Sequence, residues 1–176
     1  MKRITLITGG ARSGKSRYAL SLAREFPCPR AFIATAEPFD EEIRNRIERH
    51  RQERASDFTT FEEFMDPGMV LEQLSSDMHV AVLDCLTVWL GNLMHHNPNA
   101  SESSNRIDHF LRVLDQPPCD LIIVTNEVGM GIVPHNNLAR GFRDTAGSLN
   151  QQVATKANQV IFMVSGCPLV VKETQL

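Results

Sequence analysis

Residues 9–16 read Gly-Gly-Ala-Arg-Ser-Gly-Lys-Ser and directly follow the apolar run Ile4-Thr5-Leu6-Ile7-Thr8. This segment fits the pattern G-x-x-x-x-G-K-[ST] of a phosphate-binding P-loop placed between a strand and a helix. Its glycines let successive backbone N–H groups point at one anion, and the following helix directs its positive N-terminus at the same phosphates. We therefore expect a nucleotide site formed by Gly9, Gly10, Ala11, Arg12, Ser13, Gly14, Lys15 and Ser16.

Two side chains of the P-loop are expected to carry chemistry. Lys15 should reach the β- and γ-phosphates and act as a catalytic residue. The Ser16 hydroxyl is an expected Mg²⁺ ligand, because Mg²⁺ prefers hard oxygens and is held largely by phosphates and water. Asp84, at the end of the strand-like run Val80–Leu83, is the expected second ligand. An Asp after a strand can also begin a turn or cap the next helix, and both interpretations stay open.

The bulk properties favour one intracellular domain. The chain of 176 residues is one domain in length, and we expect a single P-loop nucleotide-binding domain over residues 1–176. The net charge of −3 gives no overall basic field, so nucleic acid is not an expected partner. The four cysteines form no C-x-x-C pair and no secretion signal opens the chain, so a reduced, cytoplasmic protein is expected. No apolar run approaches the roughly 18 residues that span a bilayer, and no membrane role is expected.

Apolar, β-rich runs alternate with helical segments along the chain. The runs expected as buried parallel strands are Ile4–Thr8, Ala31–Thr35, Val80–Leu83, Leu121–Thr125 and Val160–Val164. The helical segments are Lys15–Phe26, Glu41–Arg54, Met69–Leu74, Leu86–His95, Ile107–Leu114 and Thr145–Asn158. This alternation is typical of an α/β fold, in which helices cover both faces of a mostly parallel sheet and ligands bind at the carboxyl ends of its strands.

Two polar or terminal segments complete the outline. Residues 97–105, Asn-Pro-Asn-Ala-Ser-Glu-Ser-Ser-Asn, are rich in turn-forming residues and are expected to form an exposed loop. Near the C-terminus, Val170-Val171 is expected to lie in one edge strand.

Residues 40–54, Asp-Glu-Glu-Ile-Arg-Asn-Arg-Ile-Glu-Arg-His-Arg-Gln-Glu-Arg, form an unusually charged segment after the second strand. If it is helical, Ile43, Ile47, His50 and Arg54 share one face, which could point at the nucleotide. Cationic neighbours disfavour the imidazolium form, and a neutral imidazole can act as a nucleophile. A charged helix with one histidine is also typical of a solvated face, so the residues alone leave both interpretations open.

Residues 121–134, Leu-Ile-Ile-Val-Thr-Asn-Glu-Val-Gly-Met-Gly-Ile-Val-Pro, form a strand that runs into a loop with two glycines. A loop at the carboxyl end of a strand is well placed for substrate contact. Asn126 and Glu127 would stand beside the P-loop, where they could position a Mg²⁺-bound water or an acceptor hydroxyl. Ordinary loop structure is the alternative.

Taken together, these motifs resemble the bifunctional adenosylcobinamide kinase/adenosylcobinamide-phosphate guanylyltransferase family of cobalamin biosynthesis. The resemblance covers nearly the whole chain. Its marks are residues 8–17 and 125–134, Ile33-Ala34-Thr35-Ala36, Arg46-Ile47 with His50-Arg51 and Arg54, Leu138-Ala139-Arg140, Phe142-Arg143-Asp144, Gly147 and Asn150-Gln151. The combination of the arginine-containing P-loop with the Thr-Asn-Glu-Val-Gly-Met-Gly loop is specific, whereas a P-loop alone is not.

The resemblance implies a P-loop NTPase-like (RecA-like) fold, a homotrimer, and two Mg²⁺-dependent reactions. The first phosphorylates adenosylcobinamide with ATP or GTP. The second transfers GMP from GTP to adenosylcobinamide phosphate through a GMP-histidine intermediate, and the matching residue is His50. The family's nucleotide contacts carry over onto the P-loop and onto Ala34, Thr35, Ala36, Arg51, Gln52, Glu53, Arg54, Glu62 and Asp84.

Some positions depart from the family's pattern, and two other functions fit part of the sequence. Ala55 stands where the family often has Pro, Phe58 where Trp is common, and Asp84 where some relatives use Glu. None of these changes removes a reacting group. A nucleotide switch that binds GTP without transferring any group, and a small-molecule kinase with His50 on its surface, are the competing hypotheses.

Overall fold

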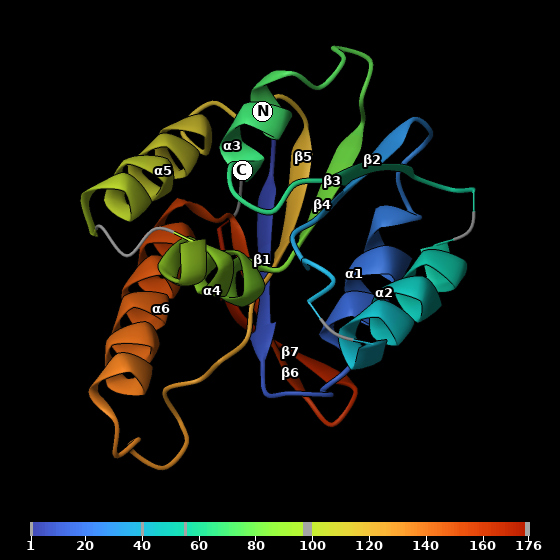
Figure 1. The fold of residues 1–176 in the computed structure, drawn as a ribbon. Coiled ribbons are helices and arrows are strands. Elements are labelled where there is room, and N and C mark those ends of the chain that lie inside the picture. Colours follow the sequence, from blue (N-terminus) through green and yellow to red (C-terminus); the bar gives the residue numbers. More distant parts are fainter. Residues whose placement is uncertain (1, 40, 55, 97–99, 175–176) are drawn as a thin grey trace.

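A computed structural model of the chain describes residues 2–39, 41–54, 56–96 and 100–174. In these ranges one sheet has the strand order β3-β2-β4-β5-β1-β6-β7 (Figure 1). All neighbouring strands are parallel except β7, which runs antiparallel to β6. The strands are β1 (Ile4–Gly9), β2 (Arg30–Ala34), β3 (Thr59–Glu62), β4 (Val80–Asp84), β5 (Asp120–Val124), β6 (Gln159–Val164) and β7 (Cys167–Glu173).

Helices cover both faces of this sheet, as the alternation of segments predicted. They are α1 (Lys15–Ala23), α2 (Glu41–Arg54), α3 (Pro67–Glu72), α4 (Leu86–His96), α5 (Ala100–Val113) and α6 (Asn137–Lys156). Residues of α1 pack against one face of the central strands, and residues of α3, α4, α5 and α6 pack against the other. None of the helices in the described ranges has the length and apolar character needed to cross a bilayer.

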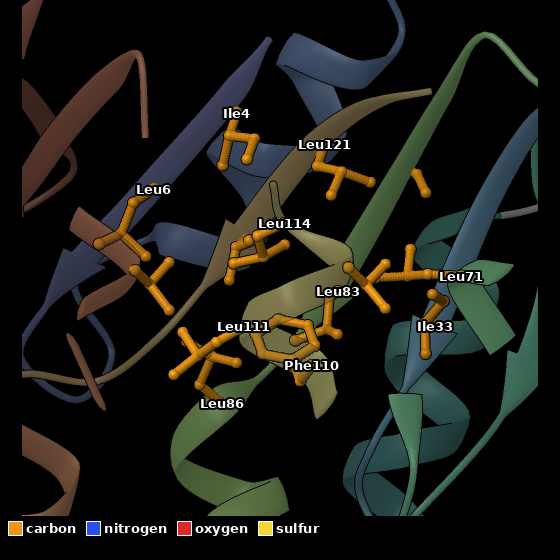
Figure 2. Close-up of a cluster of buried hydrophobic side chains, with 14 of the residues drawn as sticks. Ile4, Leu6, Ile33, Leu71, Leu83, Leu86, Phe110, Leu111, Leu114 and Leu121 are labelled. Atoms are coloured by element: carbon orange, nitrogen blue, oxygen red, sulfur yellow. The ribbon is translucent and has the colours of Figure 1, made fainter. Parts of the chain in front are cut away.

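Burial on both faces explains why the strands are continuous apolar runs. Side chains alternate across the sheet, so Leu6 and Leu83 face α3 to α6 while Ile7 and Val82 face α1. Figure 2 shows the larger of these clusters, in which side chains from β1, β2, β4 and β5 meet those of α3, α4 and α5. At its centre Phe110 is fully buried, and its ring lies 5.1 Å from that of Trp89 in an edge-to-face arrangement.

Several boundaries differ from the sequence-based expectations. The prediction of an exposed loop over residues 97–105 is wrong from Ala100 onward, because α5 begins at Ala100. Residues 97–99 lie outside the described ranges. The Ser103 hydroxyl contacts the Leu93 carbonyl, and Glu102 in the first turn favours the helix dipole. Helix α6 begins at Asn137 rather than near Thr145. The side chain of Asn136 caps it by accepting from the Ala139 N–H at 2.7 Å.

Two strands were missed or underestimated. The short, largely exposed sequence Thr-Thr-Phe-Glu of β3 has little apolar character, and it pairs in parallel with Ala31–Ala34 of β2. Strand β7 spans seven residues rather than the Val170-Val171 pair, and it confirms the expected edge strand. Sheet pairing, rather than local propensity, stabilises these two edge segments.

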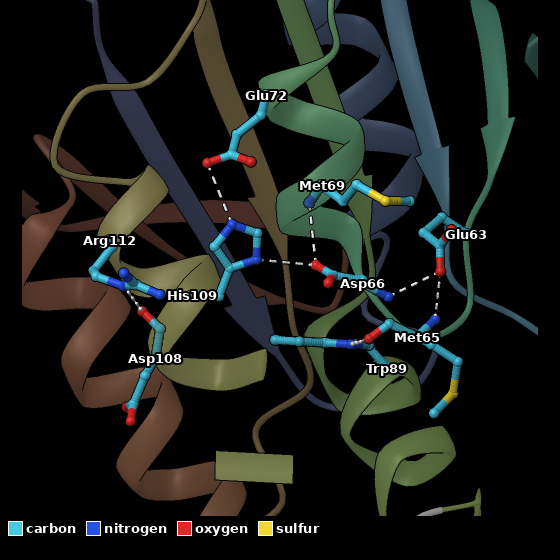
Figure 3. A network of polar contacts seen from close by, with 9 residues as sticks. All are labelled: Glu63, Met65, Asp66, Met69, Glu72, Trp89, Asp108, His109 and Arg112. Atoms are coloured by element: carbon cyan, nitrogen blue, oxygen red, sulfur yellow. Dashed lines mark hydrogen bonds and ion pairs between the residues drawn. The ribbon is translucent and has the colours of Figure 1, made fainter. Parts of the chain in front are cut away.

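A polar network fixes the segment that follows β3 (Figure 3). The carboxylate of Glu63 accepts from the N–H groups of Met65 and Asp66 at 2.8 Å each. The Met65 carbonyl accepts from the Trp89 indole at 2.9 Å, and the ring of His109 lies 3.3 Å from carboxylate oxygens of Asp66 and Glu72. The connection after Glu62 is therefore tied to α4 and α5.

Phe110→Ala tests the importance of the larger cluster. Truncating this fully buried ring should lower the free energy of unfolding by about 3–5 kcal/mol, because transfer energy is lost and a cavity is left. Urea unfolding followed by far-UV circular dichroism measures the change. Met130→Ala, at an exposed loop position, should stay within about 0.5 kcal/mol of the parent protein. A similar cost for both variants would contradict the assignment of Phe110 to the core.

Candidate nucleotide and phosphate site

The predicted P-loop connects β1 to α1 with the backbone conformation that its glycines permit. Gly9 and Gly14 have φ values of 148° and 95°, and Arg12 also has a positive φ of 56°. Gly14 is the N-cap of α1, so the helix N-terminus opens at the end of the loop. The buried Lys15 side chain donates to the Gly10 carbonyl at 2.6 Å and lies 3.4 Å from the Ser13 hydroxyl. This backbone conformation and the Lys15 ammonium group agree with what the predicted anion site requires.

The β6–β7 hairpin supports this loop from one side. The Gly166 N–H, in the hairpin turn, donates to the Ser13 carbonyl at 3.0 Å. On the adjoining strand, a Cβ added at Gly9 would lie 2.5 Å from the Met163 carbonyl oxygen. Glycine is therefore required at position 9 both by its φ angle and by the close approach of β6.

Buried hydrogen bonds fix the carboxyl ends of β2 and β4 to each other. The fully buried Thr35 hydroxyl donates to the Cys85 carbonyl at 2.9 Å and accepts from the Cys85 N–H at 2.8 Å. The amide group of Asn92, on α4, donates to the carbonyls of Thr35 and Phe64 at 2.7 and 3.0 Å. The hydroxyl and carbonyl groups of Thr35 are thus hydrogen-bonded within the protein. Its neighbours Ala34 and Ala36 lie on the path of the chain from β2 to α2.

A second set of hydrogen bonds joins the residues that follow β5 to α4, to α6 and to Gly9 at the start of the P-loop. Asn126 donates to the Thr87 hydroxyl through its backbone N–H at 2.9 Å and its side-chain amide at 3.0 Å. Asn150 on α6 accepts from the Thr125 hydroxyl at 2.8 Å and donates to the Asn126 carbonyl at 3.3 Å. The Glu127 N–H donates to the Gly9 carbonyl at 3.0 Å. The loop that follows β5 is thereby fixed beside the P-loop, as its position after a parallel strand predicted.

The two expected metal ligands both lie at this edge of the sheet. Ser16 is in the first turn of α1, and Asp84 ends β4 with a half-buried side chain. Burial of the thiol and, to a smaller extent, the negative charge of Asp84 raise the pKa of Cys85 to about 11. The positive charge of Lys15 lowers this pKa slightly. Because a hydroxyl and a carboxylate are hard oxygen ligands, this pair suits Mg²⁺ that is held mainly by substrate phosphates.

No cluster of three or more His, Cys, Asp or Glu side chains that could hold a metal ion occurs within the described ranges.

A cavity of about 400 Å³ lies between α2 and the residues that follow β2 and β3. Three residues expected in the nucleotide site, Ala36, Arg51 and Glu62, line it together. Arg51 forms an ion pair with Glu62 and lies 3.8 Å from Glu48. The remaining lining residues are Pro38, Arg44, Asn45, Ile47, Glu48 and Phe64.

The expected helix over residues 41–54 is confirmed as α2, and His50 lies within it. The side chains of Ile43, Arg46, His50, Glu53 and Arg54 are outside the described part of the structure, as is the whole of Ala55. Gln52 is exposed. Phe58, the residue that departs from the family's usual Trp, is buried edge-to-face against Phe32 at 6.3 Å.

The connection from β2 to α2 is attached to the end of α4. His96 lies 2.7 Å from a carboxylate oxygen of Glu37, and the Phe39 ring stacks on the His96 ring at 6.1 Å. The sequence analysis did not identify these contacts, nor the roles of Thr87, Asn92 and Asn150. The available signal was a polar Asn92 within the largely apolar helix α4, since buried polar groups need partners.

Comparison with protein families identifies the chain. The family described as cobinamide kinase/cobinamide phosphate guanyltransferase matches residues 5–171. The chain belongs to this family. It is therefore an enzyme of a family with kinase and guanylyltransferase activities, which confirms the resemblance inferred from the motifs.

Curated members of the family are similar over nearly their full length. The bifunctional adenosylcobalamin biosynthesis protein CobU of Escherichia coli is 36% identical, covering 95% of this chain and 98% of the relative. The bifunctional adenosylcobalamin biosynthesis protein CobP of Pseudomonas aeruginosa is 38% identical, covering 95% and 96%.

Solved structures of distant proteins share the fold. A KaiC-like protein of Pyrococcus horikoshii has a TM-score of 0.52 at 13% identity, covering 97% of this chain and 79% of that chain. A solved ATPase domain has a TM-score of 0.52 at 10% identity, covering 98% and 77%. These likenesses confirm the P-loop NTPase-like, RecA-like arrangement that the resemblance implied.

Gly9→Ala and Gly10→Ala test the steric constraint at the start of the P-loop. The first change should cost about 2–4 kcal/mol of unfolding free energy, because the new Cβ meets the Met163 carbonyl and the φ of 148° is unfavourable. The second should cost less than about 1 kcal/mol, since a Cβ at Gly10 has nothing within 4 Å. Thermal and urea unfolding provide the comparison, and equal costs would refute the constraint.

The cysteines provide a test of burial at both ends of the strands, because Cys85 follows β4 and Cys119 precedes β5. Cys28 and Cys167 are exposed and should react rapidly with a disulfide reagent at pH 8, whereas burial raises the pKa of Cys85 and of Cys119 to about 11 and should protect both. Since unfolded thiols ionise near pH 9, stability should fall between pH 9 and 11 as only the unfolded state loses these protons. Thiol titration before and after denaturation measures the protection; rapid labelling of Cys85 in the native protein would contradict it.

Proposed function

We propose that this enzyme phosphorylates adenosylcobinamide with ATP or GTP and then transfers GMP from GTP to the new phosphate through a covalent GMP adduct of His50. The observation that carries the proposal is the cavity in which Ala36, Arg51 and Glu62 meet beside the helix that contains His50. The curated relatives are named as bifunctional proteins of adenosylcobalamin biosynthesis, which supports two reactions in one chain.

The kinase step needs positioning and charge stabilisation rather than a covalent intermediate. Lys15 is preorganised at the loop by its bond to the Gly10 carbonyl, and nucleotide phosphates offer it stronger acceptors than that carbonyl. The acceptor hydroxyl attacks the γ-phosphorus, the bond to the β-phosphate oxygen breaks to release ADP or GDP, and the hydroxyl proton passes to solvent. Ser16 and Asp84 would hold Mg²⁺, which supplies charge neutralisation at the phosphates when bound.

The guanylyl transfer step uses His50 as nucleophile. A neutral imidazole nitrogen attacks the α-phosphorus of GTP, a P–N bond forms, and the P–O bond to pyrophosphate breaks. The phosphate oxygen of the acceptor then attacks the same phosphorus and breaks the P–N bond. The Glu62 carboxylate, paired with Arg51, offers two acceptor oxygens of the kind that match the N1–H and 2-amino groups of guanine.

We also propose a cytoplasmic homotrimer that has no nucleic-acid partner. Exposed apolar side chains on the edge strand β7, Leu169, Val170 and Val171, support contact with another copy. Free cysteines support a reducing compartment, and the net charge of −3 offers no overall attraction to nucleic acid. Light scattering of the purified protein measures its mass.

His50→Ala tests the covalent step. Incubation of the parent protein with Mg²⁺ and α-labelled GTP should add one GMP to the chain, through a bond that is labile in acid and stable in base. The variant should form no adduct and lose at least a thousandfold in guanylyl transfer, while phosphorylation of cobinamide continues. Intact mass and peptide mapping measure the adduct.

His79→Ala is the matched control, because His79 is exposed at the start of β4, away from the carboxyl edge. It should retain both activities. Adduct formation by the His50 variant would rule out the histidine mechanism. GTP binding by the parent protein without any adduct would favour a kinase or a nucleotide switch instead.

A further inference from the structure

The connection from β5 to α6 exposes an unusual number of apolar side chains beside the P-loop. Ile132 is 94% exposed and Met130 is 78% exposed, and Val133 and Leu138 are exposed as well. We name these four residues the loop patch. Residues 128–134 contain no charged side chain. Large exposed apolar side chains on an uncharged loop indicate a surface that another molecule covers.

The loop patch is held in place at both ends. At its start, the Glu127 N–H bonds to the Gly9 carbonyl at 3.0 Å and the Glu127 carboxylate accepts from the Gly129 N–H at 2.7 Å. At its end, the Arg140 guanidinium donates to the carbonyls of Pro134 and His135 at 2.7 and 2.6 Å. Figure 1 shows this connection extending beyond the edge of the sheet at which β1 ends. The apolar side chains are therefore presented at the same edge as the phosphate site.

We propose that the loop patch binds the macrocyclic ring of the corrinoid acceptor. This inference rests on the proposed function, because it concerns the acceptor of both transfers. In-line transfer requires the acceptor oxygen to lie about 3–3.5 Å from the phosphorus, so the ring that carries the reacting arm must rest on surface adjoining the P-loop. The loop patch is such a surface, since one hydrogen bond separates its anchor, Glu127, from Gly9.

The chemistry of the loop patch matches that of the ring. A corrin has largely hydrocarbon faces and a rim of primary amides. Apolar side chains such as Ile132 and Met130 suit the faces, because their contact removes hydrocarbon surface from water. The exposed backbone of Gly131 and the carbonyl of the exposed Gly129 suit the rim amides, which can both donate and accept hydrogen bonds.

A second copy of the chain is the alternative occupant. A protein surface bound to the loop patch would block the space beside Gly9 that an acceptor must occupy. Strand β7 offers a separate exposed apolar surface for contacts between copies. The corrinoid is therefore the favoured occupant, and the oligomeric state becomes part of the test.

The experiment compares Ile132→Asp and Met130→Asp with Met69→Asp in the full chain. Met69 is also an exposed methionine, but it lies on α3, which is far from the loop patch in Figure 1. Equilibrium dialysis with cobinamide, which is coloured, measures its Kd without any nucleotide. Each loop-patch variant should raise this Kd at least tenfold, and Met69→Asp should stay within twofold. Circular dichroism melting curves that superimpose on the parent's show that the variants are folded.

Two results would overturn the inference. One is a Kd within twofold of the parent for both loop-patch variants. The other is a change of oligomeric mass in Ile132→Asp, measured by light scattering, because it would make the patch a contact between copies. Because dialysis contains no nucleotide, failure of the corrinoid site is distinguishable from failure of the GMP-histidine mechanism, which the adduct measurement tests separately.

Discussion

Buried polar groups at the carboxyl edge of the sheet depend on one another for hydrogen bonds. The Thr35 hydroxyl bonds to both backbone groups of Cys85, and the side-chain amides of Asn92 and Asn150 donate to the carbonyls of Thr35 and Asn126. Because an unsatisfied buried polar group costs free energy, each side chain of this network helps to hold its partners in place. The site therefore stands on a network that fixes the ends of β2, β4 and β5 relative to the P-loop.

One polar atom stands outside this network. The Thr8 hydroxyl is the buried side-chain polar atom that has no hydrogen-bond partner within the described ranges. It precedes Gly9, the residue whose backbone conformation opens the P-loop. The unsatisfied group thus lies at the carboxyl end of β1, next to the P-loop.

Features set by local chemistry could be predicted from the sequence, and features set by distant partners could not. The P-loop and the apolar runs of β1, β4 and β5 were predictable, because glycine spacing and continuous burial leave direct marks in the sequence. The polar strand β3 and the start of α5 were not, since each is stabilised by pairing or packing with remote segments. The same holds for the candidate site. The P-loop pattern predicts Lys15, and the end of an apolar strand predicts Asp84. The role of Asn92, in contrast, depends on two carbonyls distant in sequence.

The hydrogen bond from the hairpin turn to the P-loop joins two segments that lie far apart in the sequence. Ser13 is synthesised well before its partner Gly166. Strand β6, which flanks β1 at Gly9, is also synthesised after the P-loop. During synthesis, the P-loop therefore emerges before the segments that support it from the side. Loss of the β6–β7 hairpin would leave a chain that contains the complete P-loop sequence without the contacts that hold its shape.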